Sequence, residues 1–259
     1  MSDPIVAARG LKKRFGAVVA ADNVTVEIQP REVLGVIGAN GAGKTTFVNM
    51  VTGYLKPDEG TILFRGADIS QLPPREVTRL GVHRSFQVAQ LFPNLSVRDN
   101  VLVALASVER RRPSLVAALR TSDSIAQANG ILARLGLQDA AERSTTELPQ
   151  GQRKLLDITL AMVGRSAVLL LDEPTSGISA DEKFPLMDLV MDAVAAEEAA
   201  ILFVEHDMEL VERYAARVIA FYEGRVIADG APDAVLTDVD VRRYVVGAEL
   251  HRRADRART

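Results

Sequence analysis

The residues best suited to bind a phosphate chain lie together in one short segment. From Val33 to Val51 an apolar run passes through glycines and then resumes with apolar residues at helical spacing. Within it, Gly38 is followed after four residues by Gly43, Lys44 and Thr45. In this pattern backbone N–H groups surround a polyphosphate, the ammonium reaches its outer phosphates, and the threonine hydroxyl binds Mg²⁺. The pattern predicts a P-loop between a buried strand and a helix; a glycine-rich turn is the alternative.

A second apolar run ends in two carboxylates. Residues 167–171 read AVLLL, and Asp172, Glu173 and Pro174 follow. Ligands bind at the carboxyl ends of parallel strands in open α/β sheets, and the predicted P-loop begins at such an end. A helix N-cap is an alternative for the acidic pair, and Pro174 is compatible with it. Together with a P-loop threonine, however, an Asp in this place is typical of a Mg²⁺ site.

Further strands must position these motifs. Alternating β-branched residues predict antiparallel strands from Ile5 to Phe15 and from Val18 to Ile28, ahead of the P-loop. A third buried strand, Ala200 to Val204, ends in a polar cluster that contains His206. Phe15 follows a basic run, and it would either stack on a base or lie half-buried at a sheet edge.

The middle of the chain changes from strand to helix patterns. From Ser96, a capping residue followed by apolar residues at helical spacing predicts a helix. Two more helices are expected from Ile125 to Leu137 and from Leu155 to Met162. A further apolar face predicts a helix with Pro185 in its first turn, where a missing N–H is tolerated.

These elements predict one α/β domain over residues 1–259. Residues 1–91 and 165–259 would form its core and antiparallel strands, residues 92–164 an inserted helical section, and residues 251–259 a loosely ordered tail. A strand that ends near residue 86 leads toward the helical section, and Gln87 follows it. By itself, this glutamine indicates only a solvated loop residue.

Composition limits the classes of function. The chain has 259 residues, 47% hydrophobic, and a net charge of -3, which disfavours general nucleic-acid binding. It has no cysteine, which excludes disulfides and thiolate sites, and its histidines lack metal-ligand spacing. The N-terminal segment lacks a signal-peptide pattern, and no run of about 18 apolar residues occurs. We therefore expect a soluble, unexported protein that contacts a membrane only through a partner or through its surface.

The order of these motifs resembles the ATP-binding subunits of ABC transporters over nearly the whole chain. The resemblance is carried by the P-loop, Gln87, a loop at residues 148–152 ahead of a helix, the LLLDEP segment and His206. It implies a P-loop NTPase of ABC type, α/β in class, with a RecA-like core, an antiparallel β subdomain and a helical subdomain. It also implies an ATP hydrolase coupled to transport, with ATP and Mg²⁺ as ligands.

The resemblance assigns a role to each matching position. Glu173 would act as general base, Gln87 would sense Mg²⁺ and the attacking water, and His206 would hydrogen-bond the γ-phosphate. Mg²⁺ would be held by Thr45, Gln87 and Asp172. The nucleotide would contact Phe15 by stacking, together with Gly38, Asn40, Gly41, Ala42, Gly43, Lys44, Thr45 and Thr46, and Gly151 would act in trans.

Two positions depart from the family pattern. The signature loop of the family usually reads Leu-Ser-Gly-Gly-Gln, and here Pro149 occupies the serine position. Proline has neither a hydroxyl nor an N–H, and a hydrogen bond to a charged group is worth roughly 1.5–3 kcal/mol. Ser179 stands where an aspartate is usual. Because two such domains pair head to tail, both changes should weaken hydrolysis at the partner's P-loop.

Three segments are similar to uptake systems for branched-chain amino acids. They are FGAVVAADNVTVEI, RSFQVAQLFPNLSVRDNV and VEHDMELV. The longer span before the signature is similar to the larger of two ATPase subunits in those systems. The implied partners are a second ATPase subunit, as homodimer or heterodimer, integral-membrane permeases and, indirectly, an external solute-binding protein, with no nucleic acid. The implied place is peripheral, on the cytoplasmic face of the bacterial inner membrane.

Two other functions remain open from the sequence. An ATPase subunit of a lipid or lipopolysaccharide export system shares the same core motifs. A dimer that ATP closes with negligible hydrolysis would fit Pro149 and Ser179, although Glu173 beside an intact P-loop argues against it.

Overall fold

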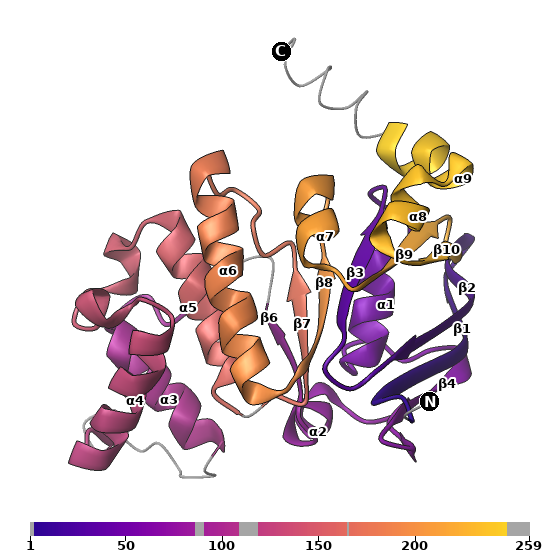
Figure 1. Cartoon of the computed structure of the whole chain (residues 1–259). Helices are drawn as coiled ribbons and strands as arrows, with labels where there is room; N and C mark the ends of the chain where they lie inside the picture. The colour runs from indigo at the N-terminus through magenta and orange to yellow at the C-terminus, as the bar shows by residue number, and fades with distance from the viewer. Residues whose placement is uncertain (1–2, 86–90, 109–118, 165, 248–259) are drawn as a thin grey trace. The chain divides into compact units, whose positions relative to one another are not determined.

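The computed structural model describes residues 3–85, 91–108, 119–164 and 166–247 of the chain. The chain divides into two compact units, one formed by Met1–Leu80 with Ala200–Thr259 and the other by Gly81–Ala199. Both units contain helices and strands, as expected for an α/β protein (Figure 1).

The first unit contains an antiparallel sheet with the strand order β2-β1-β4-β5. The strands are β1 (Val6–Phe15), β2 (Val18–Ile28), β4 (Glu59–Phe64) and β5 (Ala67–Asp68). Register pairs such as Val6 with Ile28 and Phe15 with Val18 confirm the expected antiparallel pairing of the first two strands. The alternating residues Val24, Val26 and Ile28 are buried, so one face of β2 belongs to the core.

A second group of strands in this unit has the order β10-β9-β3-β8. It comprises β3 (Val33–Gly38), β8 (Ala200–Val204), β9 (Arg217–Tyr222) and β10 (Arg225–Gly230). β3 runs parallel to both β8 and β9, and β10 forms an antiparallel hairpin with β9. The continuous apolar sequences of β3 and β8 reflect burial on both faces, as is typical of parallel strands.

Short helices complete the first unit. They are α1 (Lys44–Val51), α2 (Pro74–Arg79), α7 (Met208–Tyr214), α8 (Pro232–Thr237) and α9 (Val239–Val241), followed by the π-turn η4 (Arg242–Val246). α1 and α7 both contact β3 (Figure 1).

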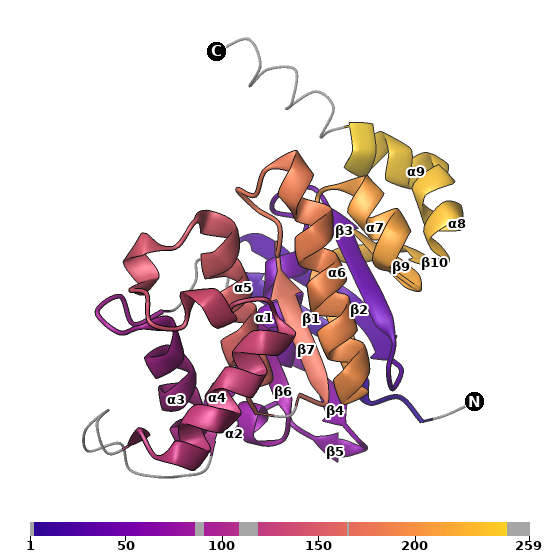
Figure 2. The same cartoon turned by 60° about the vertical axis from the view of Figure 1, so that its left-hand side comes forward.

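The second unit contains the parallel pair β6 (Val82–Ser85) and β7 (Val168–Asp172) and most of the longer helices. The helices are α3 (Val97–Val108), α4 (Ser122–Arg134), α5 (Gln150–Met162) and α6 (Ala180–Glu197), with the 3-10 turns η2 (Gln138–Ala140) and η3 (Thr145–Glu147). Figure 2 shows α3, α4 and α5 gathered beside one another. The Asp99 N–H donates to Ser96 Oγ over 3.1 Å, which confirms the expected cap.

Three helices differ in their bounds from expectation. α4 runs from Ser122 to Arg134 rather than from Ile125 to Leu137. The other two are α5 and α6. α5 begins at Gln150 rather than at Leu155, because its polar first turn carries no apolar periodicity. α6 begins at Ala180, so Pro185 lies inside the helix and not in its first turn. Ser179 and Glu182 have the spacing of a capping-box sequence. In the structure the Ser179 hydroxyl donates to Glu182 Oε2 over 2.9 Å and does not cap a helix N–H. The start of α6 therefore follows the capping-type residue Ser179 and not the position of Pro185.

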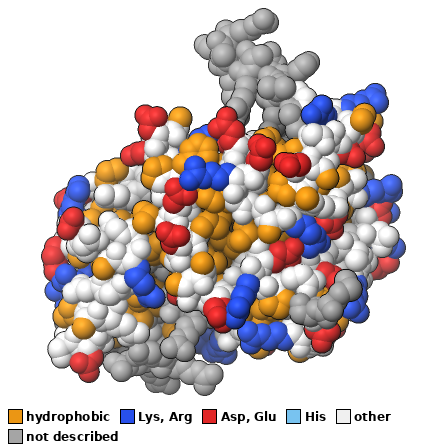
Figure 3. Space-filling model, viewed as in Figure 1, with side chains coloured by type: hydrophobic (Ala, Val, Ile, Leu, Met, Phe, Trp, Pro, Cys, Tyr) orange, Lys and Arg blue, Asp and Glu red, His pale blue; other side chains and the backbone are white. Residues whose placement is uncertain are grey.

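The absence of membrane-spanning helices among the described residues and the distribution of surface charge complete this description. Within the described ranges, none of the helices is long and apolar enough to cross a membrane. Side chains of both charge signs are spread across the face that Figure 3 shows. The arginines at residues 110–112 and the segment 251–259 lie outside the described residues.

Candidate nucleotide-binding site

The predicted P-loop connects β3 to α1, and Gly43 is the N-cap of that helix. Gly43 has a φ of 107°, and a Cβ added there would fall 2.6 Å from the carbonyl oxygen of Ala20. Glycine is therefore required at this position both for its backbone conformation and for space. The first helical hydrogen bond runs from Phe47 N–H to Gly43 O over 2.9 Å, so the preceding N–H groups lie at the open end of the helix.

The Lys44 ammonium lies over the loop that precedes it. Its Nζ donates to Gly38 O over 2.5 Å and to Ala39 O over 3.1 Å, and the residue is 6% exposed. A buried ammonium held by backbone carbonyls is a positive charge fixed against the loop, as phosphate binding requires. Of the other expected contacts, Asn40, Gly41 and Thr45 are exposed, Thr46 is half-buried, and Ala42 is buried.

His206 lies at the same edge of the sheet as the P-loop. β8 pairs in parallel with β3, with Val204 opposite Val36, and Glu205 N–H continues the ladder to Val36 O over 3.2 Å. The next residue, His206, is half-buried, and its backbone N–H donates to Glu205 Oε2 over 3.1 Å. The first unit therefore carries an imidazole and a phosphate cradle at the carboxyl ends of neighbouring strands.

The ring of Phe15 is exposed at the end of β1. It is 51% exposed, and the Lys13 ammonium lies 5.9 Å from its centroid. The sequence left two interpretations of Phe15 open, a ring that stacks on a base and a half-buried residue at a sheet edge. The exposure of the ring favours the first. An accessible aromatic face beside a cation is suited to stacking on a nucleotide base.

In the second unit, Asp172 ends β7 and is 5% exposed. Arg84 on the neighbouring strand β6 donates from Nη2 to Asp172 Oδ2 over 2.6 Å, and the buried Lys154 donates to the Asp172 carbonyl over 3.4 Å. The Arg84 guanidinium thus compensates the burial of this carboxylate, and the Lys154 ammonium bonds the main-chain carbonyl of the same residue. The sequence analysis missed both of them.

Glu173 has a backbone conformation that a residue with a side chain rarely adopts. Its φ is 49°, in the left-handed region, which costs roughly 1–2 kcal/mol for an L-residue. Such strain is maintained only where the surroundings impose it, and it gathers at functional sites. The half-buried Glu173 side chain follows the buried Asp172 directly, so the two adjacent carboxylates occupy different environments.

The signature-like loop forms the start of α5. Pro149 is the N-cap, and its carbonyl accepts from Arg153 N–H over 3.0 Å. A Cβ on Gly151 would lie 3.9 Å from Ile178 Cδ1, an ordinary contact, so packing within the chain does not require this glycine. At Gly177, in contrast, a Cβ would fall 2.0 Å from the Gln150 side-chain nitrogen. The segment after Glu173 therefore packs closely on the signature loop.

The expected site residues thus fall into two groups. The first unit holds Phe15, the P-loop and His206, and the second holds Asp172, Glu173 and the loop with Gly151. Gln87 lies outside the described residues.

Comparison with known proteins identifies the family of the chain. The family model described as ABC transporter matches residues 21–176. The chain is 36% identical over 255 residues to the high-affinity branched-chain amino acid transport ATP-binding protein LivG of Escherichia coli, covering 95% of this chain and 99% of that protein. It is 33% identical over 258 residues to BraF of Pseudomonas aeruginosa, described in the same words, with 95% and 99% covered.

A solved structure extends the similarity to three dimensions. The crystal structure of the ADP conformation of an ATP-binding cassette of an ABC transporter superposes with a TM-score of 0.82 at 28% identity. The match covers 94% of this chain and 98% of that one.

Proposed function

This chain belongs to the ABC transporter family and is an ABC-type ATPase, and we propose that it powers an importer of branched-chain amino acids. The observation that carries the ATPase function is the P-loop, with Lys44 fixed over it and Gly43 in a position that excludes any side chain. The amino-acid cargo is supported by the similarity to LivG and BraF over nearly the full length of both proteins.

In this proposal the first unit binds the nucleotide. The exposed ring of Phe15 stacks on the base, and the N–H groups of the P-loop and of the first turn of α1 bind the phosphates. Lys44 neutralises charge on the outer phosphates. His206, at the same sheet edge, is positioned to donate a hydrogen bond to the terminal phosphate. The remaining phosphate contacts are assigned to Gly38, Asn40, Gly41, Ala42 and Thr46.

Glu173 acts on the attacking water in this mechanism. Its carboxylate accepts a proton from the water or orients it, and the strained backbone at this residue supports a functional role for it. Gln87 would contact the same water. Mg²⁺, held by the oxygen groups of Thr45, Asp172 and Gln87, would supply charge neutralisation at the phosphates. These ligands fit the ion because Mg²⁺ prefers hydroxyl, carboxylate and amide oxygens.

The second unit supplies the signature to a partner. Two ATPase chains would pair head to tail, so that Gly151 and the open end of α5 approach the nucleotide of the other chain. The absence of a packing requirement at Gly151 supports this role, because close approach by a ligand explains the glycine. In this proposal the whole chain is one ABC nucleotide-binding domain, with residues 92–164 as its helical subdomain. Permeases would anchor it peripherally at the cytoplasmic face of the inner membrane.

A second candidate function rests on Pro149. Because proline offers neither a hydroxyl nor an N–H, a pair of identical chains would close on ATP with one donor fewer at each site. Such a pair would act as a nucleotide-gated clamp with little turnover.

Steady-state ATPase measurements separate the two candidates. We would compare the wild-type chain, Glu173→Gln and the control Glu198→Gln, an exposed residue at the end of α6, each alone and with a partner ATPase subunit. An ATPase whose base is Glu173 should lose about 100-fold or more of its turnover in Glu173→Gln while retaining ATP binding. The control should behave as wild type. Turnover absent from every wild-type sample would favour the clamp.

The cargo is tested separately in proteoliposomes. The chain would be reconstituted with its permeases and binding protein, and uptake of labelled leucine would be followed with and without ATP. ATP-dependent uptake that disappears in Glu173→Gln supports the proposal. ATPase activity without leucine uptake would contradict the assigned cargo and leave the ATPase standing.

A further inference from the structure

The turn between β9 and β10 is hydrogen-bonded to the P-loop. It consists of Glu223 and Gly224, whose φ values of 47° and 77° are both left-handed, as in a type I′ hairpin turn. Gly224 N–H donates to Ala42 O over 2.9 Å. Ala42 precedes Gly43 in the P-loop, so the turn is bonded directly to the phosphate-binding segment.

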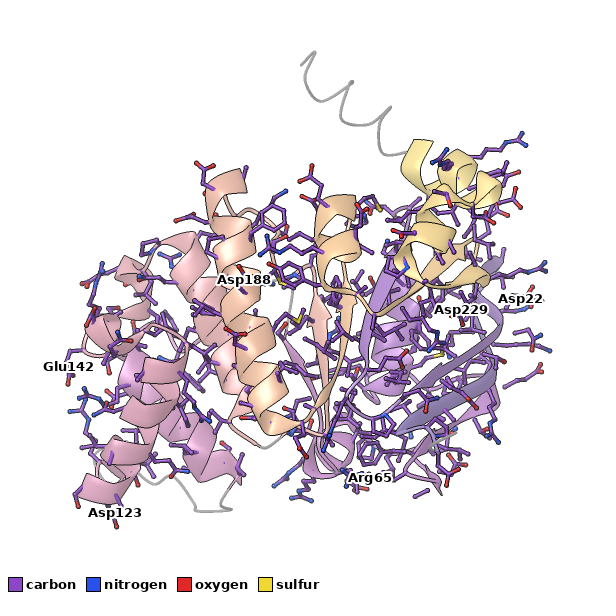
Figure 4. All side chains as sticks on the ribbon, viewed as in Figure 1. Asp22, Arg65, Asp123, Glu142, Asp188 and Asp229 are labelled. Atoms are coloured by element: carbon purple, nitrogen blue, oxygen red, sulfur yellow. The ribbon has the colours of Figure 1, made fainter. Side chains whose placement is uncertain are left out.

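The same glycine is bonded to the antiparallel sheet. Asp22 N–H on β2 donates to Gly224 O over 2.8 Å, and the Arg225 side chain pairs with the Asp22 carboxylate over 2.5 Å. β2 and β10 contact each other. Figure 4 labels Asp22 on β2 and Asp229 on β10. Gly224 therefore accepts from one neighbour through its carbonyl and donates to the other through its N–H.

No side chain separates the three backbones at this point. A Cβ on Gly224 would lie 3.1 Å from the carbonyl carbon of Ala20 and 3.2 Å from the nitrogen of Ala21. A Cβ on Gly43 would lie 2.6 Å from Ala20 O and 3.2 Å from the Gly224 Cα. The P-loop, β2 and the turn are thus in direct backbone contact, and added volume would push them apart.

β2 connects this contact to the base-stacking residue. Phe15 pairs with Val18 at the start of the β1–β2 hairpin, and Ala20 lies two residues further along β2. We infer that Gly224 is a positioning residue that sets the spacing between the Phe15 ring and the P-loop. The inference rests on the proposed nucleotide site. A nucleotide contacts the protein through its base and its phosphates at once. A change in the distance between the Phe15 ring and the P-loop therefore weakens the binding of ATP more than the binding of the base or the phosphates alone.

A matched glycine exists for the test. Gly66, in the turn between β4 and β5, has a φ of 80° and follows Arg65 with a φ of 48°. A Cβ on Gly66 meets no atom of the described residues within 4 Å. Gly66→Ala therefore imposes a similar backbone strain in a similar turn, without the contact to the P-loop.

The experiment measures the binding of Mg-ATP and of Mg-tripolyphosphate by calorimetry in Gly224→Ala and Gly66→Ala. We expect Gly224→Ala to weaken ATP binding about tenfold, or about 1.4 kcal/mol, and to change tripolyphosphate binding less than twofold. Gly66→Ala should leave both affinities unchanged. Equal weakening of both ligands, or no weakening of either in Gly224→Ala, would overturn the spacing role. If the alanine variant does not fold, Gly224→Asn and Gly66→Asn replace the pair, because asparagine tolerates the left-handed region better.

A double-mutant cycle with Phe15→Ala separates this inference from the proposed site. If both are correct, Phe15→Ala weakens ATP binding, and Gly224→Ala has little further effect in that background. If Phe15→Ala weakens binding and Gly224→Ala adds its full effect, the spacing role is wrong and the stacking role stands. If Phe15→Ala alone has no effect, the stacking role itself is wrong, and the spacing role falls with it.

Discussion

Arg84 and Asp172 form an ion pair of 2.6 Å between neighbouring strands, and their side chains are only 9% and 7% exposed. Removing one partner of a buried pair leaves the other charge uncompensated, which typically costs about 3–5 kcal/mol. We therefore expect Arg84→Met to lower the free energy of unfolding by about that amount, as measured by urea denaturation.

The control for this prediction is an exposed pair. Arg9 and Glu27 lie 3.7 Å apart with side chains 56% and 45% exposed, and such pairs contribute about 1 kcal/mol or less. Arg9→Met should therefore change stability little. Equal losses in the two variants would show that burial does not decide the strength of the Arg84 pair.

The strained backbone at Glu173 leads to a prediction of opposite effects on stability and activity. Glycine adopts a φ of 49° without strain, so Glu173→Gly should raise the free energy of unfolding by up to about 1 kcal/mol. The same variant should lose about 100-fold or more of its ATPase turnover, because the carboxylate is gone. Glu198→Gly, at a φ of 57° beyond the end of α6, should gain similar stability and keep its turnover. A drop in the stability of Glu173→Gly alone would mean that side-chain contacts outweigh the strain.

Pro149 allows the capping of α5 to be varied in place. Its φ of -54° and ψ of 156° suit a serine N-cap, whose Oγ would accept from Gly151 or Gln152 N–H. Pro149→Ser should thus be more stable than Pro149→Ala by about 1 kcal/mol, by thermal unfolding. In a homodimer, Pro149→Ser should also raise ATPase turnover above both the wild type and Pro149→Ala. Identical turnover in the serine and alanine variants would exclude the hydroxyl as a phosphate donor.

Asp99 provides a prediction about acid stability. Burial raises the pKa of Asp99, but hydrogen bonds from Arg120 and Ser96 lower it by more, so its net pKa lies below the ordinary 3.8. Arg120 donates to both carboxylate oxygens over 2.9 Å. Because the folded-state pKa is the lower one, this contribution is fully present above the unfolded pKa and is lost as the pH falls through the folded pKa.

The corresponding variant is Arg120→Gln. Since the Arg120 side chain is 44% exposed, we expect it to lose about 1 kcal/mol at pH 7 and to show a smaller further loss below pH 4 than the wild type. Urea unfolding between pH 3 and pH 7 measures both. In an Asp99→Asn background, Arg120→Gln should no longer alter the loss of stability below pH 4. If it still alters that loss, another group causes the pH dependence.

Much of the fold was predictable because its signals are local. The spacing from Gly38 to Thr45 and the apolar run before Asp172 each place a strand and a loop without reference to the rest of the chain. The start of α5 was mispredicted because periodicity is carried by apolar residues and its first turn is polar. Arg84 as the partner of Asp172 could not be predicted, since only the pairing of β6 with β7 brings the two side chains together.

The two departures from the family pattern both lie at the N-cap of a helix. Pro149 is the N-cap of α5, and Ser179 is the N-cap of α6. Proline has no side-chain acceptor for the N–H groups of Gln150, Gly151 and Gln152, which precede the first helical hydrogen bond. We therefore expect the first turn of α5 to open easily in the isolated chain, and to be held closed when a second chain brings an anion to it. Hydrogen exchange at these three amides should slow when the dimer forms, so it would report assembly even where no ATP is turned over.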